Sequence, residues 1–283
     1  MHIKRRVFIK NLILGLLGVV GFIYLDSFWI EKYIIDWNTH DLSDATKAKI
    51  KIIQLSDLHL KEIKYFHKTI AEKINTEKPD IIVFTGDTIS RRNTYHILEQ
   101  LLDLIDPNLL KIAILGNKEY DARVDLDTLK ATFKKYNGIV LINEHYVFKK
   151  ANRAINIVGI DDFLRGKPDF LKAIHNIDKK IETIVLNHCP AYTDVIDTLN
   201  IEENINIKLV LSGHTHGGQI TFFGIPFYTP GGSGNYLRGW YKKTTTKMYV
   251  SKGIGTTVLP IRFFARAEAS IFYMGASHPN TSR

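Results

Sequence analysis

The sequence predicts an α/β layered domain with a hydrophobic helix in front of it, and two alternating patterns carry that prediction. Short runs rich in isoleucine and valine, apolar on both faces, alternate with longer segments in which apolar residues recur every three or four positions. Runs of the first kind are typical of buried strands, and segments of the second kind are typical of helices that pack on a sheet. We therefore expect a sheet that is largely covered by helices.

The individual elements follow from these patterns in chain order. Strands are expected at 50–55, 81–85, 111–115, 154–160, 183–187, 209–212 and 247–251. Helices are expected between them, at 67–76, 94–105, 125–136, 169–176 and 193–199. The run 220–228 is apolar and aromatic, and we interpret it as a buried hairpin, with a surface for acyl chains as the alternative.

The composition sets broad limits on the class of protein. With 45% hydrophobic and 24% charged residues in 283, the chain has an ordinary globular balance that argues against disorder, collagen or coiled coil. The net charge of +9 leaves nucleic acid, phosphate esters and membrane surfaces open as anionic partners. The single cysteine, Cys189, excludes an intramolecular disulfide and the paired cysteines of zinc fingers.

We interpret residues 1–32 as a twin-arginine-like leader or a membrane anchor. A basic cluster is followed by the uncharged run 11–25, which is apolar all round and shorter than the roughly 20 residues that span a bilayer. The cluster consists of Lys4, Arg5, Arg6 and Lys10, and 5–10 resembles the twin-arginine export consensus. Because no small-x-small cleavage site follows, an uncleaved anchor and a removed leader both stay open. A helix docked on the domain is the less favoured alternative.

The remaining chain divides into three parts by composition. A polar linker is expected over 33–49, the main domain over 50–275, and a tail over 276–283.

The chemistry is predicted to lie in the loops that follow five of the strands. Carboxyl ends of strands in an open α/β sheet gather at one edge, so these loops are expected to converge there. The candidate ligands in them are Asp57, His59, Asp87, Asn117, His188, His214 and His216. Carboxylate, imidazole and amide oxygen suit Mn²⁺, Fe or Zn²⁺, and these donors are too many for one tetrahedral ion. They are enough for two ions that share a bridging carboxylate, an arrangement suited to phosphoryl transfer.

In their order and spacing these motifs resemble the calcineurin-like metallophosphoesterase superfamily, and more closely its bacterial YkuE/YaeI-like membrane-associated branch. The closer likeness lies in 55–60, 213–219 and 249–255. The resemblance implies a four-layer α/β/β/α sandwich of two mixed sheets and a dinuclear centre, for which we expect Mn²⁺, with Fe or Zn²⁺ as alternatives. It also implies a role for each ligand: Asp57, His59 and His216 hold the first metal, Asn117, His188 and His214 hold the second, and Asp87 bridges them.

One position departs from the family pattern. Where the family has a histidine after Gly-Asn, this chain has Lys118. A lysine ammonium can neutralise a developing oxyanion but is a poor proton donor at neutral pH. We assign Lys118, Asn117 and Asp87 as the catalytic residues, with Lys118 as a clamp on the phosphate. Arg262 is a weaker candidate for substrate binding, and a surface salt bridge is its alternative.

The resemblance implies a metal-dependent phosphoric ester hydrolase of the phosphodiesterase or pyrophosphatase type at the bacterial inner membrane. Some members of this branch cleave UDP-2,3-diacylglucosamine, the lipid A precursor, and such a lipid-linked nucleotide is the first specific substrate we consider. An exported phosphodiesterase that acts on cell-envelope phosphoesters is the alternative, so the side of the membrane stays open. A pseudoenzyme that binds metal or phospholipid is the alternative of another class. We expect a monomer and no nucleic-acid partner, since no basic-aromatic recognition element is visible.

Overall fold

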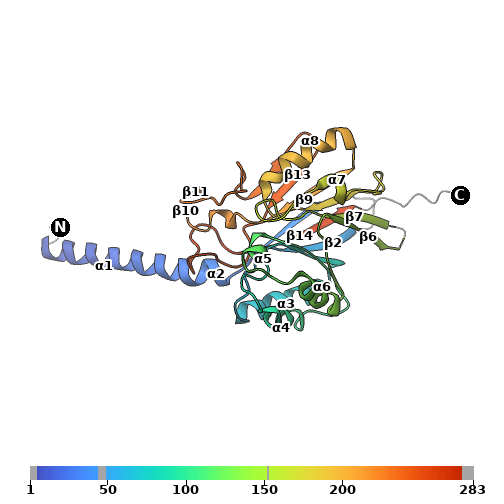
Figure 1. Cartoon of the computed structure of the whole chain (residues 1–283). Helices are drawn as coiled ribbons and strands as arrows, with labels where there is room; N and C mark the ends of the chain where they lie inside the picture. Colours follow the sequence, from blue (N-terminus) through green and yellow to red (C-terminus); the bar gives the residue numbers. More distant parts are fainter. Residues whose placement is uncertain (1–4, 44–48, 152, 276–283) are drawn as a thin grey trace.

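The computed structural model describes residues 5–43, 49–151 and 153–275, and within them two six-stranded sheets lie face to face (Figure 1). The first sheet has the order β1-β14-β2-β3-β4-β5. Its strands are β1 (Asp36–Leu42), β14 (Glu268–Gly275), β2 (Lys49–Leu55), β3 (Ile81–Thr85), β4 (Leu110–Ile114) and β5 (Gly138–Val140). β2 to β5 are parallel, whereas β14 runs antiparallel to β2 and carries β1 parallel at the edge.

The second sheet has the order β12-β13-β9-β8-β7-β6. Its strands are β12 (Gly239–Lys242), β13 (Lys247–Val250), β9 (Ile207–Ser212), β8 (Thr183–Leu186), β7 (Arg153–Gly159) and β6 (Glu144–Lys150). The four central strands are parallel and both edge strands are antiparallel to their neighbours, so both sheets are mixed, as predicted.

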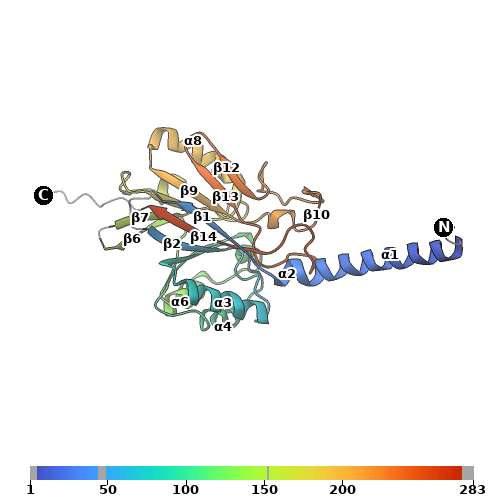
Figure 2. The ribbon, with the colours of Figure 1, turned by 180° about the vertical axis from the view of Figure 1, so that it is seen from behind.

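Three apolar clusters hold the layers together. Ile52, Ile157 and Leu209 belong to the cluster that fills the space between the two sheets. The outer face of the first sheet is covered by α3 (Tyr65–Glu77), α4 (Tyr95–Leu102) and α6 (Leu126–Lys135). The outer face of the second sheet is covered by α7 (Phe170–Ala173) and α8 (Thr193–Glu203). The result is the predicted four-layer α/β/β/α sandwich, seen from two sides in Figures 1 and 2.

The predicted strands and helices are all present, with ends that differ by a few residues. The structure adds β1, β5, β6, β12 and β14, and the short helices α5 (Asn117–Asp121), η2 (Pro190–Tyr192) and η3 (His216–Gly218). β1 lies inside the predicted linker over 33–49. Its polar sequence forms a strand because β14 offers a parallel edge from Asp36 to Leu42. Residues 44–48 of that linker, Lys4 and the tail over 276–283 lie outside the described residues.

The N-terminal helix α1 (Arg5–Leu25) extends away from the domain and buries none of its residues (Figure 1). The helical segment continues through the π-helical turn η1 (Asp26–Ile30) and α2 (Glu31–Tyr33), and the whole stretch is long and apolar enough to cross a membrane. A helix docked on the domain is therefore excluded for α1. A membrane anchor and a signal sequence both fit this finding.

The predicted hairpin at 220–228 is present but is not buried. It consists of β10 (Thr221–Phe222) and β11 (Ile225–Pro226), which pair antiparallel. The side chains of Phe223 and Phe227 are 78% and 77% exposed. The prediction of burial is wrong because both sheets are already covered by helices, so no sheet face is left for this hairpin to cover.

Candidate metal centre

The predicted ligands converge at the carboxyl ends of five strands. Asp57 and His59 follow β2, Asp87 follows β3, and Asn117 follows β4. The strands β8 and β9 of the other sheet deliver His188, His214 and His216. The expected single sheet edge is therefore wrong: both sheets contribute, because they lie face to face with these strand ends at the same end of the sandwich.

A first group of donors is formed by Asp57, His59 and His216, all buried, whose ligand atoms lie within 4.8 Å of one another. The Nε2 atoms of His59 and His216 are 3.0 Å apart. His216 Nε2 lies 3.6 Å from Asp57 Oδ1. Three donors this close together could hold one metal ion.

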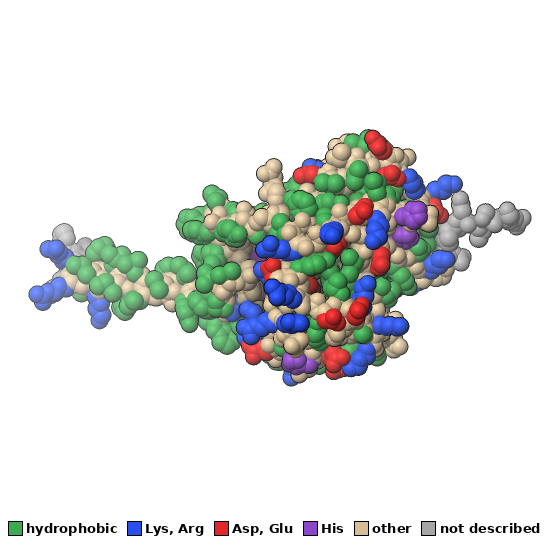
Figure 3. All heavy atoms as spheres, viewed as in Figure 1, with side chains coloured by type: hydrophobic (Ala, Val, Ile, Leu, Met, Phe, Trp, Pro, Cys, Tyr) green, Lys and Arg blue, Asp and Glu red, His purple; other side chains and the backbone are tan. Residues whose placement is uncertain are grey.

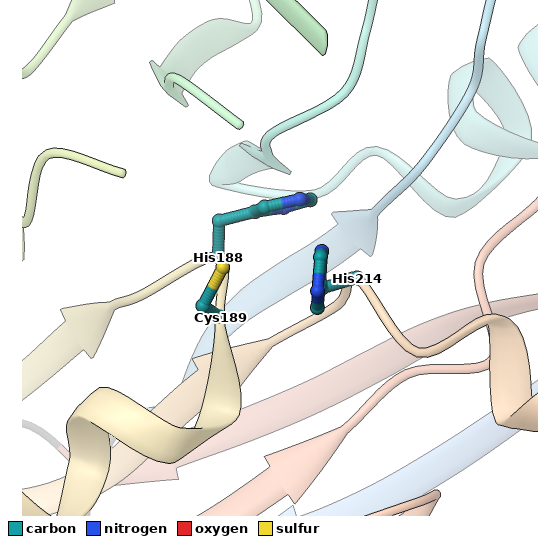
Figure 4. Close-up of side chains that lie close together, drawn as sticks. All are labelled: His188, Cys189 and His214. Atoms are coloured by element: carbon teal, nitrogen blue, oxygen red, sulfur yellow. The ribbon is translucent and has the colours of Figure 1, made fainter. Parts of the chain in front are cut away.

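A second group is formed around Asn117. Its Oδ1 lies 3.1 Å from His214 Nδ1 and 3.4 Å from His188 Nε2. Figure 4 shows the His188 and His214 rings next to each other, with Cys189 beside them. The thiol of Cys189 donates to Asp162, and burial raises its pKa, so it lacks the thiolate form that binds metal. The second group therefore consists of Asn117, His188 and His214.

Asp87 lies between the two groups. Its Oδ2 is 3.6 Å from His59 Nε2 in the first group, and its Oδ1 is 3.5 Å from His188 Nε2 in the second. One carboxylate with an oxygen toward each group is the arrangement that a bridging ligand needs.

Three of the imidazoles are held in place by contacts on the side away from the centre. His188 Nδ1 donates to the Thr85 carbonyl oxygen at 2.8 Å, and His214 Nε2 donates to the Gly231 carbonyl oxygen at 2.6 Å. His59 Nδ1 lies 2.6 Å from Ser90 Oγ. Such contacts fix the ring orientation and, for His188 and His214, leave the other nitrogen free to act as a ligand.

The backbone at the centre is strained. The left-handed region is rarely adopted by residues with a Cβ, yet it holds ligands from three of the loops. These ligands are Asp57 (φ 52°), His59 (φ 46°), Asp87 (φ 52°), His214 (φ 72°) and His216 (φ 52°). Strain of this kind gathers at functional sites, where the surrounding structure enforces it.

Glycines make room for the ligands. A Cβ on Gly213 would overlap Ser56 Oγ and Asp57 Oδ2, and a Cβ on Gly116 would overlap Asp87 Oδ1. Glycine at both positions therefore lets these turns pass close to the candidate ligands.

The electrostatics of the cluster fit a cation. Burial lowers the pKa of His214 and of His216 to about 4, so both are neutral, the form in which imidazole binds metal. Burial raises the pKa of Asp87 well above its usual range, and the nearby His188 offsets only part of that effect. The ion-pair contacts of Asp57 and Asp87 are to imidazoles. A divalent cation would neutralise these buried carboxylates, and the donor set fits two such ions.

Glu119 is a functional residue that the sequence motif contained but that we did not single out. It is 2% exposed, and its two oxygens accept hydrogen bonds from four backbone N–H groups. These belong to Asp87, Thr88, Ile89 and Gly116. Glu119 thus ties the loop that carries the bridging residue to the loop that carries Asn117. Its place in Gly-Asn-Lys-Glu was the available signal.

The two remaining candidates lie in different places. Lys118 lines the cavity beside the centre, its backbone N–H donates to Asp87 Oδ1 at 2.7 Å, and its Nζ pairs with Asp121 at 2.9 Å. Arg262 is fully buried, so the expected surface salt bridge is wrong. It donates to the carbonyl oxygens of Gly253 and Gly255 and lies 3.4 Å from His216 Nδ1. Arg262 therefore supports the back of the centre rather than the cavity.

The cavity in front of the centre has a volume of about 440 Å³ and a mixed lining. Its polar side chains include those of the centre: Asp87, Asn117, Lys118, His214 and His216. Its apolar side chains are Ile220, Phe227, Tyr228, Pro230, Val258 and Leu259.

Several known proteins resemble this chain. It is 30% identical to the uncharacterized metallophosphoesterase YkuE of Bacillus subtilis over 97% of this chain and 99% of that protein. It is 32% identical to an uncharacterized metallophosphoesterase of Aquifex aeolicus, over 90% of this chain and 95% of the other. It is 27% identical to the UDP-2,3-diacylglucosamine pyrophosphatase LpxG of Chlamydia muridarum, over 78% and 82%.

The family model for the calcineurin-like phosphoesterases matches residues 50–218, the segment that runs from β2 to the last ligand loop. All seven ligand positions lie within it, at the strand ends where the two donor groups form. The chain therefore belongs to the calcineurin-like phosphoesterase family and is a metal-dependent phosphoester hydrolase.

Proposed function

We propose that this enzyme hydrolyses a lipid-linked phosphoester at a membrane surface with a dinuclear metal centre. The observation that carries the proposal is the mixed lining of the cavity, because its polar and apolar side chains could take up a polar head and an apolar tail together. The long apolar helix at the N-terminus supports a location at the membrane.

Each ion would have its own ligands. Asp57, His59 and His216 would hold the first, and Asn117, His188 and His214 the second, with Asp87 shared; Mn²⁺ is the ion we propose. When bound, the ions act as Lewis acids that lower the pKa of bound water and stabilise charge on the phosphoryl oxygens.

Lys118 would clamp the phosphate. Its side chain is one-third exposed at the cavity, and its partner Asp121 also pairs with Arg165, so that carboxylate keeps a partner when the ammonium turns away. A cation at this point can neutralise charge on the phosphate, but a lysine is a poor proton donor to a leaving group at neutral pH. This favours substrates whose leaving group needs little protonation, such as pyrophosphates.

UDP-2,3-diacylglucosamine, hydrolysed as in lipid A biosynthesis, is the specific substrate we propose first. It is a pyrophosphate with acyl chains, and the relative LpxG is named as its pyrophosphatase. The exposed, apolar residues Val258 and Tyr228 at the cavity wall would face the acyl chains.

An exported phosphodiesterase acting on cell-envelope phosphoesters is the second candidate, and the charge distribution along the helix favours it. Arg5, Arg6 and Lys10 flank the N-terminal end of α1, whereas the first fifteen residues after it, 26–40, contain Lys32 alone as a basic residue. Basic flanks stay in the cytoplasm, which would put the domain on the outer side. An alkaline phosphatase reporter fused to the C-terminus would be active only there, and its activity would exclude a cytoplasmic nucleotide substrate.

The full chain in lipid nanodiscs tests the activity itself. We expect hydrolysis of bis-p-nitrophenyl phosphate with Mn²⁺ and its loss in Asp87→Ala, and we expect UDP-2,3-diacylglucosamine to yield UMP and a lipid phosphate. Hydrolysis of the first compound alone would favour the envelope phosphodiesterase. Absence of turnover with every metal tried would favour a protein that binds metal or phospholipid without catalysis.

A further inference from the structure

We propose that the face of the domain around the cavity mouth docks on the lipid bilayer through an apolar rim. The rim consists of two segments, the hairpin residues Phe222, Phe223, Ile225, Phe227 and Tyr228 and the loop residues Val258, Leu259 and Phe264. Val258 is 96% exposed and the five hairpin side chains are 56–78% exposed. An exposed apolar cluster of this kind marks an interaction surface rather than ordinary surface composition. This inference concerns binding, and it goes beyond the proposed reaction.

Hydrogen bonds and a ring contact connect the two segments of the rim. The hairpin and the loop are joined by the hydrogen bond from Thr221 N–H to the Phe263 carbonyl at 2.9 Å. Gln219 donates to the carbonyl oxygens of Thr257 and Leu259 at 2.9 and 3.0 Å. The Phe223 and Phe264 rings stack with centroids 6.0 Å apart. These bonds hold the apolar side chains outward in one arrangement.

The rim lies where the N-terminal helix leaves the domain. Arg262 N–H donates to the Ser27 carbonyl at 3.1 Å, and the Ala265 and Ala267 N–H groups both donate to Glu31. Figures 1 and 2 show α1 and β10 on the same side of the molecule in both views. The uncharged part of α1, residues 11–25, is about 22 Å long, and together with η1 the segment 11–30 reaches about 30 Å, close to the thickness of the bilayer core. If α1 spans a bilayer, its domain end places the rim at the lipid interface.

A second set of side chains extends this face around the foot of the helix. Trp29, Ile34 and Tyr65 are 56–80% exposed there, beside a groove that Lys64 and Lys73 also line. Figure 3 shows the hydrophobic side chains gathered where the helix meets the domain, with lysines and arginines next to them. Tryptophan and tyrosine favour the membrane interface, and lysines there attract anionic headgroups.

The docking would give the cavity a direction. Phe227, Tyr228, Val258 and Leu259 belong to the rim and also line the cavity. A cavity whose mouth is made of the docked residues opens toward the bilayer. A lipid could therefore reach the centre without crossing water, whichever lipid phosphoester is the substrate.

Spin labels on the full chain test the docking. Single cysteines are introduced by Ile225→Cys in the hairpin and Leu259→Cys in the loop, with Lys149→Cys on β6 as the control at the other end of the molecule; the native Cys189 is buried. The proteins are placed in nanodiscs of phosphatidylcholine and phosphatidylglycerol. We expect the labels at 225 and 259 to be accessible to oxygen and protected from a water-soluble nickel chelate, and the label at 149 to show the reverse.

Nickel accessibility at 225 and 259 equal to that at 149 would overturn the proposal. Protection from both reagents would overturn it too, since it would point to a second copy or another protein on the rim.

A charged substitution separates docking from catalysis. Phe223 does not line the cavity, and its φ of 49° is one that aspartate tolerates better than most residues. We expect Phe223→Asp to increase the accessibility of the spin label at 259 to the nickel chelate. Hydrolysis of bis-p-nitrophenyl phosphate should stay within about twofold of wild type. An unchanged label would contradict the docking. The accessibility measurement needs no substrate, so it tests the docking even if the proposed lipid hydrolysis is not found.

Discussion

The Glu119 carboxylate accepts a hydrogen bond from the backbone N–H of Asp87 at 3.1 Å, and this contact holds the residue that we propose as the bridging ligand. The same oxygen accepts from Gly116 at 2.8 Å, so the loops after β3 and β4 are joined through one side chain. The positions of the candidate ligands therefore depend on the Glu119 carboxylate, which binds backbone N–H groups and is not itself a candidate ligand.

Glu119→Gln is expected to weaken the centre. The amide would turn an NH₂ group toward N–H donors, so some of them would lose their partner while buried. Loss of such a supporting contact typically weakens metal binding by about 10–100-fold. Calorimetric titration with Mn²⁺ measures the change, with the exposed Glu202→Gln as control. An unchanged Kd in Glu119→Gln would show that the loops keep their positions without it.

Two glycines near the centre make a matched pair for mutagenesis. A Cβ on Gly213 would overlap the Asp57 carboxylate, whereas a Cβ on Gly231 would meet nothing within 4 Å. We expect Gly213→Ala to displace the ligand and to reduce kcat/KM by about 100-fold, the usual scale for a misplacement near 1 Å. Gly231→Ala should stay close to wild type. Equal activity of the two variants would contradict the close packing around Asp57.

Lys118→Ala tests the phosphate clamp. The backbone N–H of residue 118 keeps its bond to Asp87, so Mn²⁺ affinity should not change. Loss of one charge-assisted contact to the phosphate should reduce kcat/KM by roughly 10–100-fold. Lys118→Arg should recover much of the loss, and Lys130→Ala, on the exposed side of α6, serves as control. Wild-type kcat/KM in Lys118→Ala would exclude the clamp.

The candidate ligands, which the structure brings together, could be singled out in the sequence because their signals are local. Asp57, Asp87 and His214 each stand just after a β-branched run and beside a glycine or a second donor, and such short patterns survive without knowledge of the fold. The division of the strands between two sheets could not be obtained in that way, since β14 pairs with β2 across most of the chain.

Contacts between segments that are far apart in the sequence also explain the other differences between the prediction and the structure. Asp36–Leu42 is a strand only because β14 lies beside it, and Arg262 is buried only because the loop 252–255 folds over it. The run 220–228 carries the same apolar residues whether it faces a core or a membrane. Composition alone does not distinguish these two apolar environments.

His67 on α3 gives a prediction on pH that is independent of the metal centre. Its Nδ1 accepts the Lys64 backbone N–H at 2.9 Å at the start of the helix, and burial lowers its pKa to about 4. The native state therefore keeps His67 neutral while the unfolded chain takes up a proton near pH 6.5, so this residue destabilises the fold as the pH falls from 6.5 toward 4. The full effect on the free energy of unfolding is about 3 kcal/mol.

Glutamine at position 67 can accept the same hydrogen bond without titrating. We expect His67→Gln to match wild type in urea unfolding at pH 7.5 and to exceed it in stability at pH 4.5, while the exposed His96→Gln follows wild type at both. A constant difference between His67→Gln and wild type across this pH range would show that His67 does not contribute to the acid sensitivity.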